Sequence, residues 1–218
     1  SAMVLAATAS LLIEHGGPEA GSVADRNRLA AASLERAITL EPVSSFVWEQ
    51  QARMQVAFGA FDLARSSFSS AVQLNPANVD ALSAYAQLLA FSGRLDDAEG
   101  MARDAAERSP APPARYHGVP ALLALRDGDF AKAVANAEIY AQADRELGPI
   151  LAIMAAQRAG DSGVVNRYLP QVLEVATFRA QGVLPRLRKR ITDDRLLGAI
   201  ETALLQAGVP AASLSAPF

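Results

Sequence analysis

The sequence predicts an all-α fold of stacked helix pairs, and three observations support this prediction. Alanine is abundant among the 218 residues and β-branched residues do not cluster. This composition is typical of closely packed helices, because alanine costs least in a helix and lets helix axes approach. Prolines recur every 34 residues, at Pro42, Pro76 and Pro110. Between them, apolar residues such as Ala64 and Phe68 follow helical spacing.

The same interval relates other positions along the chain. Ala30, Ala64 and Ala98 are each 34 residues apart, and Gly59 recurs as Gly93, then less regularly as Gly128 and Gly160. Small residues at fixed positions are what two antiparallel helices need where they cross closely. A glycine supplies the left-handed turn that ends the first helix of a pair. The sequence therefore contains an internal repeat, and each repeat unit is one helix pair.

The segment from Trp48 to Pro76 resembles the tetratricopeptide repeat, whose period is 34 residues. It departs from that family's pattern at Gln51 and Gln55, which stand where leucine and tyrosine are usual. The matching positions are Trp48, Ala52, Gly59, Ala64, Phe68, Ala71 and Pro76. The resemblance implies a right-handed superhelix (α-solenoid) of about five helix-turn-helix repeats plus a C-terminal capping helix pair.

We expect a single solenoid domain over residues 4–210, with residues 1–3 a remnant of cloning. A long polar loop at 16–22 should separate the two helices of the first repeat. The expected repeats lie at about residues 4–44, 45–78, 79–112, 114–145 and 146–177, and the capping helices at about 178–208. A solenoid needs such a cap, because its last repeat otherwise exposes an apolar face.

Proline and capping residues predict the less regular parts. Pro112, Pro113 and Pro120 suit a helix entry, so the first helix of repeat four should begin late. Pro170 should kink the second helix of repeat five. The last helix should be capped by Thr192 or Asp193 and end at Gly208.

No residue pattern indicates catalysis, so we expect neither enzyme activity nor a cofactor or metal. The chain has no cysteine, and its two histidines, His15 and His117, lie in different repeats. No zinc-protease, nucleophile-elbow or P-loop motif is present. The acid pairs at 96–97 and 193–194 fall at helix starts, where they offset the macrodipole. Residues 116–118 could contact a ligand, although a helix-entry loop is the simpler interpretation.

Charge argues against a nucleic-acid partner, since the formal net charge is −3. The basic run Arg186–Arg190 is either a patch for acidic partners or the solvated face of a short helix. The apolar stretch at residues 3–13 is shorter than the roughly 20 residues of a membrane span, so no membrane insertion is expected. A cytoplasmic location is slightly favoured over a periplasmic one, and the excess of arginine over lysine suggests a GC-rich bacterium.

In the family that the chain resembles, certain first-helix positions face a concave groove that holds peptides or helices. Carried over by the repeat phase, they predict a partner-binding groove with apolar, amide and arginine side chains. Several of its apolar members could instead pack against neighbouring helices. The predicted groove residues are Phe46, Glu49, Arg53, Gln87, Phe91, Arg115, Arg126, Met154, Gln157 and Arg158.

The order of the C-terminal half is also similar to the C-terminal tetratricopeptide regions of bacterial multidomain regulators, including class III adenylate cyclases and winged-helix regulators. The expected function is therefore a non-catalytic scaffold that binds a protein or peptide, as a regulatory segment of a larger bacterial protein. Two alternatives stay open. One is a homodimerisation module that associates through its concave face, and the other is a small-molecule sensor.

Overall fold

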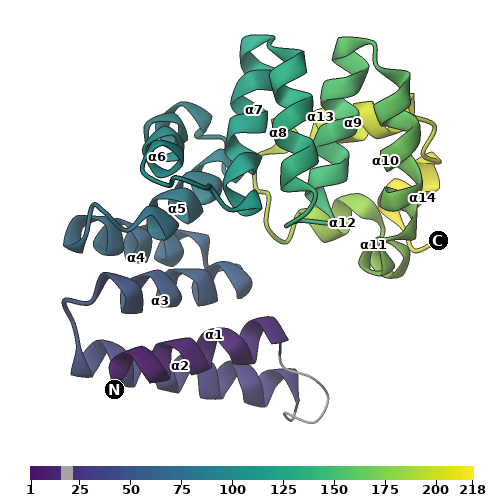
Figure 1. The fold of residues 1–218 in the computed structure, drawn as a ribbon. Coiled ribbons are helices and arrows are strands. Elements are labelled where there is room, and N and C mark those ends of the chain that lie inside the picture. Colours follow the sequence, from purple (N-terminus) through teal and green to yellow (C-terminus); the bar gives the residue numbers. More distant parts are fainter. Residues whose placement is uncertain (16–21) are drawn as a thin grey trace. The chain divides into compact units, whose positions relative to one another are not determined.

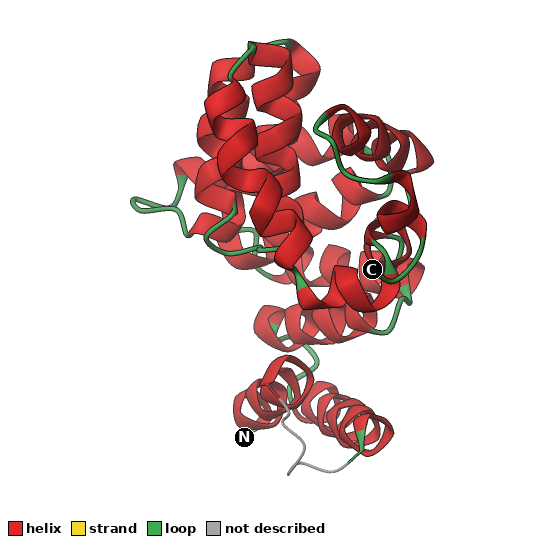
Figure 2. Ribbon diagram, turned by 90° about the vertical axis from the view of Figure 1, so that its right-hand side faces the viewer, coloured by secondary structure: helices red, strands yellow, loops and turns green. Residues whose placement is uncertain are grey.

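Helices are the regular elements of this protein. The computed structural model describes residues 1–15 and 22–218, and within these ranges every regular element is an α-helix or a short 3-10 helix (Figure 2). The all-α class predicted from the sequence is confirmed. The polar loop expected at residues 16–22 falls, except for Ser22, outside the described residues. Ser22 itself caps the following helix, because its hydroxyl accepts a hydrogen bond from the Asp25 backbone.

The chain divides into two compact units, Ser1–Leu88 and Leu89–Phe218. Each unit is described by itself. The single continuous domain that the sequence leads us to expect over residues 4–210 stays a prediction.

The first unit contains two helix pairs and most of a fifth helix. Its alanine positions are fully buried where helices cross, including Ala30, Ala64 and Ala71. The indole of Trp48 donates a hydrogen bond to the Pro42 carbonyl over 2.8 Å, so it fixes the entry to its helix. The helices are α1 (Ala2–His15), α2 (Val23–Leu40), α3 (Ser45–Ala57), α4 (Phe61–Leu74) and α5 (Val79–Phe91), whose last turn belongs to the second unit.

Glycine ends the first helix of a pair, as the repeat predicts. Gly59 follows α3 with a φ of 75°, in the left-handed region that other residues rarely adopt. Gly93, Gly128 and Gly160 have φ angles between 74° and 79° at the equivalent turns. The turn therefore has the same geometry in four successive pairs.

The second unit continues the pairs and ends in shorter helices (Figure 1). As expected, the first helix of repeat four begins late, after a 3-10 turn. The elements are α6 (Leu95–Glu107), η2 (Ala114–His117), α7 (Gly118–Asp127), α8 (Phe130–Tyr140), α9 (Leu147–Ala159), α10 (Ser162–Glu174), α11 (Ala176–Gln181), α12 (Val183–Leu187), α13 (Asp194–Gln206) and α14 (Ala211–Ser215).

After α10, three helices, α11 to α13, occupy the region where the sequence predicts a capping pair, and α14 follows beyond the Gly208 end expected for the last helix. Gly182 separates the first two with a φ of 82°, and a Cβ there would lie 2.7 Å from the Ala216 backbone nitrogen. Asp193 caps α13 as expected, since its carboxylate accepts from the Arg195 backbone. Pro170 lies inside α10, which continues through it, and the kink expected there stays a prediction.

Candidate partner-binding site

Helix α13 packs against α9, on the side that carries a predicted groove residue. Gln157 on α9 donates a hydrogen bond from Nε2 to the Ala203 carbonyl on α13 over 2.9 Å. The segment before α13 is fixed as well, because the backbone nitrogens of Thr192 and Asp193 both donate to the Phe91 carbonyl, at 2.9 and 3.1 Å. The predicted groove residues Gln157 and Phe91 are therefore engaged by the protein's own C-terminal segment.

The buried face of α13 explains this position. Leu197, Ile200 and Leu204 are at most 2% exposed, whereas Leu205 on the opposite face is 44% exposed. Such a helix is amphipathic and is stabilised by burying one apolar stripe. Figure 1 shows α13 running behind α9 within the second unit. A partner that bound this side of α9 would have to displace α13.

The predicted residues of the first unit form a polar network. Glu49 is only 4% exposed, and its carboxylate accepts hydrogen bonds from Arg53 Nε at 2.8 Å and from Asn78 Nδ2 at 3.1 Å. The Arg53 side chain stays 31% exposed. Phe46 is half-buried against the apolar core of α1 and α2. Arg53 is therefore the member of this set with both charge and exposed surface.

Two glutamines of α3 have buried oxygens that bond to no residue in the described part of the chain. These are the Oε1 atoms of Gln51 and Gln55, which are inaccessible to solvent. These residues are one helical turn apart, and they are the two positions at which the sequence departs from the repeat pattern. An unpaired buried polar atom costs free energy, so α3 is less stable than its packing allows.

Arg126 is the centre of an ion-pair cluster rather than a free groove cation. Its guanidinium contacts Asp96 at 2.7 Å, Asp127 at 2.8 Å and Glu99 at 3.0 Å. Hydrogen bonds to Asp127 and Glu99 raise the pKa of Arg126 above its ordinary value. The cluster joins α6 to α7, so this arginine has a structural role whether or not a partner also contacts it.

The other predicted arginines lie over aromatic rings. The Arg158 guanidinium is 5.0 Å from the centroid of Phe130, and that of Arg115 is 5.2 Å from Tyr116. Both arginines are exposed. Gln87 and Met154 are half-buried, and Phe91 is 5% exposed. A role in partner binding stays a prediction for all ten residues.

The three arginines of the basic run at 186–190 form ion pairs with carboxylates of the same unit. Arg186 Nε donates to both oxygens of Glu146, at 2.8 and 3.1 Å. Arg190 makes two bonds to Asp144, at 2.7 and 3.0 Å. Arg188, which is more exposed, contacts Asp194 at 2.8 Å. The run therefore ties α12 to the turn between α8 and α9, a role that the sequence pattern does not reveal.

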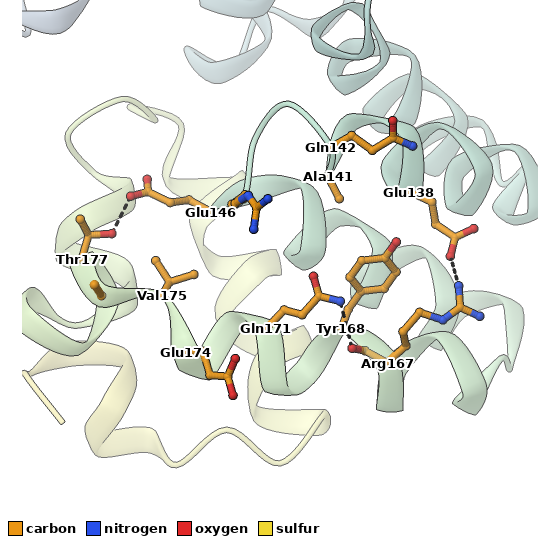
Figure 3. A pocket seen from close by; sticks show the side chains of 12 residues that line it. Glu138, Ala141, Gln142, Glu146, Arg167, Tyr168, Gln171, Glu174, Val175 and Thr177 are labelled. Carbon is orange, nitrogen blue, oxygen red and sulfur yellow. Dashed lines mark hydrogen bonds and ion pairs between the residues drawn. The ribbon is translucent and has the colours of Figure 1, made fainter. Parts of the chain in front are cut away.

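That turn borders an open cleft of about 880 Å³ in the second unit (Figure 3). The cleft lies between the end of α8, α10 and the start of α11. Tyr168 is 8% exposed at its base, and burial raises the pKa of this phenol, with a further contribution from the charge of Glu138. Glu138 pairs with Arg167 at 2.7 Å, and Thr177 donates to Glu146 over 2.6 Å. These bonds fix both walls.

Two charged residues of the cleft have no partner in the described part of the chain. Arg145 and Glu174 are both exposed and line the cleft. Neither side chain makes a hydrogen bond or ion pair with a described residue. The other charges drawn in Figure 3 are paired, as the dashed line between Glu138 and Arg167 shows. The cleft therefore offers one free positive and one free negative group.

Two absences concern residues 1–15 and 22–218. Nowhere in these ranges do three or more histidine or acidic side chains gather as they would around a metal ion. No helix there combines the length and the apolar character that crossing a membrane requires.

Comparisons with known proteins identify the repeat. The family model described as "Tetratricopeptide repeat" matches residues 55–125. A search of the curated proteins found no match. Among solved structures, PilW, titled a widely conserved type IV pilus biogenesis factor, aligns over 94% of this chain and 93% of its own, with 19% identity and a TM-score of 0.60. The tetratricopeptide domain of P58(IPK) aligns over 85% of this chain and 52% of its own, with 17% identity and a TM-score of 0.38.

Proposed function

This chain carries tetratricopeptide repeats, and from that premise we propose that it is a non-catalytic scaffold that binds a segment of a partner protein. The fold generally mediates contacts between proteins. The proposal includes the expectation that the chain is a regulatory part of a larger bacterial protein. No catalytic group enters the proposal.

The cleft beside Tyr168 carries this proposal. Its volume of about 880 Å³ is near the upper end of the roughly 300–1,000 Å³ found for ligand sites. Its walls are held by ion pairs within the unit, so little ordering of side chains is needed on binding. Arg145 and Glu174 are left to pair with a partner. We therefore infer a partner segment that carries both an acidic and a basic residue.

The predicted groove residues enter the proposal unequally. Arg53 of the first unit, and Arg115 and Arg158 of the second, keep exposed surface, so each can contact a partner within its own unit. Gln157 already bonds to α13, and Phe91 is buried. We propose that a partner contacts the exposed arginines and leaves α13 in place, because removing α13 would expose its apolar face to water.

Charge reversal tests the cleft. The double substitution Arg145→Glu with Glu174→Arg should abolish partner binding, because both free charges then repel their counterparts. The matched control is Arg36→Glu with Glu35→Arg, two exposed residues of α2 in the first unit. This control should bind normally. Circular dichroism should show the same helix content in all three proteins.

The partner can be found with a photo-crosslinking amino acid at Gln142, an exposed residue of the cleft. A crosslinked peptide with acidic and basic residues, lost with the cleft reversal and kept with the control, supports the proposal. Capture that survives the cleft reversal contradicts it. In that case the binding surface lies elsewhere.

Self-association is a second candidate, favoured by the surface of α1. Residues 2–13 of this helix carry no charged side chain, and Met3, Val4 and Leu11 are 59–64% exposed. An uncharged apolar face is self-complementary, as a twofold dimer interface must be. Light scattering over a range of concentrations tests this. Leu11→Glu should convert a dimer to a monomer, whereas a protein that is monomeric throughout removes the candidate.

A further inference from the structure

A second pocket, of about 410 Å³, lies among α6, η2, α7 and α8 in the second unit. It shares no lining residue with the cleft beside Tyr168. Its lining is partly apolar and partly polar, as in most small-molecule sites. The apolar part includes Ala102, Ala106, Pro112, Pro120 and Leu123. Polar and charged side chains make up the rest of the lining.

The hydrogen bonds of His117 orient its ring. His117 Nδ1 lies 2.8 Å from Asn136 Oδ1, and Asn136 Nδ2 donates to the Lys132 carbonyl over 2.9 Å. Because the amide nitrogen is used by that carbonyl, the amide oxygen faces the imidazole and Nδ1 must carry the hydrogen. Nε2 of the neutral ring is then an acceptor, and it bonds to no described residue.

The carboxylates of this pocket already have partners. Glu99 and Asp127 both pair with Arg126, at 3.0 and 2.8 Å. Asp129 caps α8 by accepting from the Lys132 backbone over 3.1 Å. The Lys132 ammonium has no hydrogen bond or ion pair with the residues that the structure describes. The hydrogen bond from Arg126 lowers the pKa of Asp127, and the nearby charge of Lys132 adds to that effect. Among the described charged residues that line the pocket, the Lys132 ammonium is therefore the group left without a bonded partner.

We propose that this pocket binds a small carboxylate with an apolar body and a hydrogen-bond donor. The single charge of Lys132 matches one carboxylate, the alanine and proline side chains accommodate the apolar body, and the donor bonds to His117 Nε2. The volume of about 410 Å³ is within the range of small-molecule sites. Binding here adds a ligand-responsive site to the scaffold and does not depend on the partner cleft.

The test uses 4-hydroxyphenylacetate as the probe and two matched analogues. Phenylacetate lacks the phenol donor, and tyramine replaces the carboxylate by an ammonium. Calorimetry gives the affinities. We expect 4-hydroxyphenylacetate to bind most tightly, phenylacetate more weakly and tyramine not measurably. Equal affinity for tyramine, or no saturable binding at millimolar probe, overturns the proposal.

Location is tested by NMR, because the chain has only two lysines, Lys132 and Lys189. After dimethylation with ¹³C-formaldehyde, the probe should shift the Lys132 signal and leave that of Lys189 unchanged. Lys132→Met should weaken binding about tenfold, as expected for loss of a charge-assisted hydrogen bond, and Lys189→Met should have no effect. A shift confined to Lys189 contradicts the proposal.

A steric variant tests the pocket without changing its charges. Ala106→Leu fills space beside the apolar wall and should abolish binding while circular dichroism stays helical. Lys132 is exposed, so its substitution remains informative if Ala106→Leu does not fold. Affinity unchanged in both variants overturns the assignment.

Discussion

Arg190 holds Asp144 through two parallel hydrogen bonds, from Nη1 to Oδ2 at 2.7 Å and from Nη2 to Oδ1 at 3.0 Å. The same carboxylate accepts from the Tyr140 hydroxyl and from the Leu147 backbone nitrogen, both at 2.8 Å. It therefore joins the end of α8, the start of α9 and the chain after α12. The Asp144 side chain is 13% exposed and that of Arg190 is 27% exposed, so solvent screens the pair only partly.

Removing one member of this pair should destabilise the protein strongly. Asp144→Ala leaves Arg190 largely buried without its counter-charge, and we expect the free energy of unfolding to fall by about 3 kcal/mol. Urea denaturation followed by circular dichroism measures the change. The control is Asp62→Ala, which breaks the exposed Asp62–Arg65 pair and should cost less than about 1 kcal/mol. Equal costs for the two would contradict the structural role of Asp144.

Acid should weaken the same contact. Burial alone would raise the pKa of Asp144, but the charge and hydrogen bonds of Arg190, with those of Leu147 and Tyr140, lower it below its ordinary value. Folding is therefore stabilised by the ionised form above the unfolded pKa of about 3.9. This contribution is lost as the pH falls from there through the folded pKa. Asp144→Asn should show a smaller loss of stability below pH ~4 than the wild type.

Two glycines in helices should respond oppositely to alanine. A Cβ on Gly148 would lie 2.5 Å from the Ala141 backbone nitrogen, whereas a Cβ on Gly198 meets nothing within 4 Å. Gly148→Ala should therefore destabilise the protein by about 1–3 kcal/mol through overpacking. Gly198→Ala should stabilise it by up to about 1 kcal/mol, because alanine has the higher helix propensity. Thermal unfolding of both variants checks the sign of each effect.

The position of α13 predicts a contrast between its two faces. Ile200 is fully buried and Leu205 is 44% exposed. Ile200→Ala should cost about 2–5 kcal/mol, and Leu205→Ala should change stability by no more than about 0.5 kcal/mol. If the two variants unfold at the same urea concentration, α13 does not pack on α9 in solution.

The unpaired oxygens of α3 predict a stabilising substitution. Gln51→Leu removes a buried, unbonded amide oxygen and restores the residue usual in the repeat. We expect the free energy of unfolding to rise by about 1 kcal/mol, with a similar effect for Gln55→Leu. Gln73→Leu on α4, where Nε2 bonds to Ser69 at the surface, is the control and should not stabilise. A loss of stability in both α3 variants would show that these oxygens are satisfied in solution.

The helix pairs could be predicted because their determinants are local. Gly59 sets a turn by its own φ angle, Asp193 caps the helix that follows it, and the alanines recur at the repeat interval. None of these depends on a distant residue. The same locality explains the late start of α7, which begins after Pro112 and Pro113 and has Pro120 in its first turn.

The sites could not be predicted as fully, because they depend on contacts between distant residues. Gln157 and Ala203 are 46 residues apart, as are Asp144 and Arg190. A repeat phase places Gln157 on the inner side of α9 but says nothing of a later helix that packs there. The run at 186–190 likewise shows its charge but not the carboxylates that neutralise it. The cleft beside Tyr168 has no motif, since its residues come from two separate segments, 138–146 and 167–177.

The bonds from Thr192 and Asp193 to Phe91 have a consequence for cooperativity. In a repeat array whose units contact only their neighbours, unfolding can begin at either end and spread step by step. Here the segment just before α13 bonds to Phe91, close to the start of the second unit, so opening at that start also removes contacts of the C-terminal region. The amides of the second unit should exchange with solvent in a single opening reaction, whereas α1 and α2 can open first.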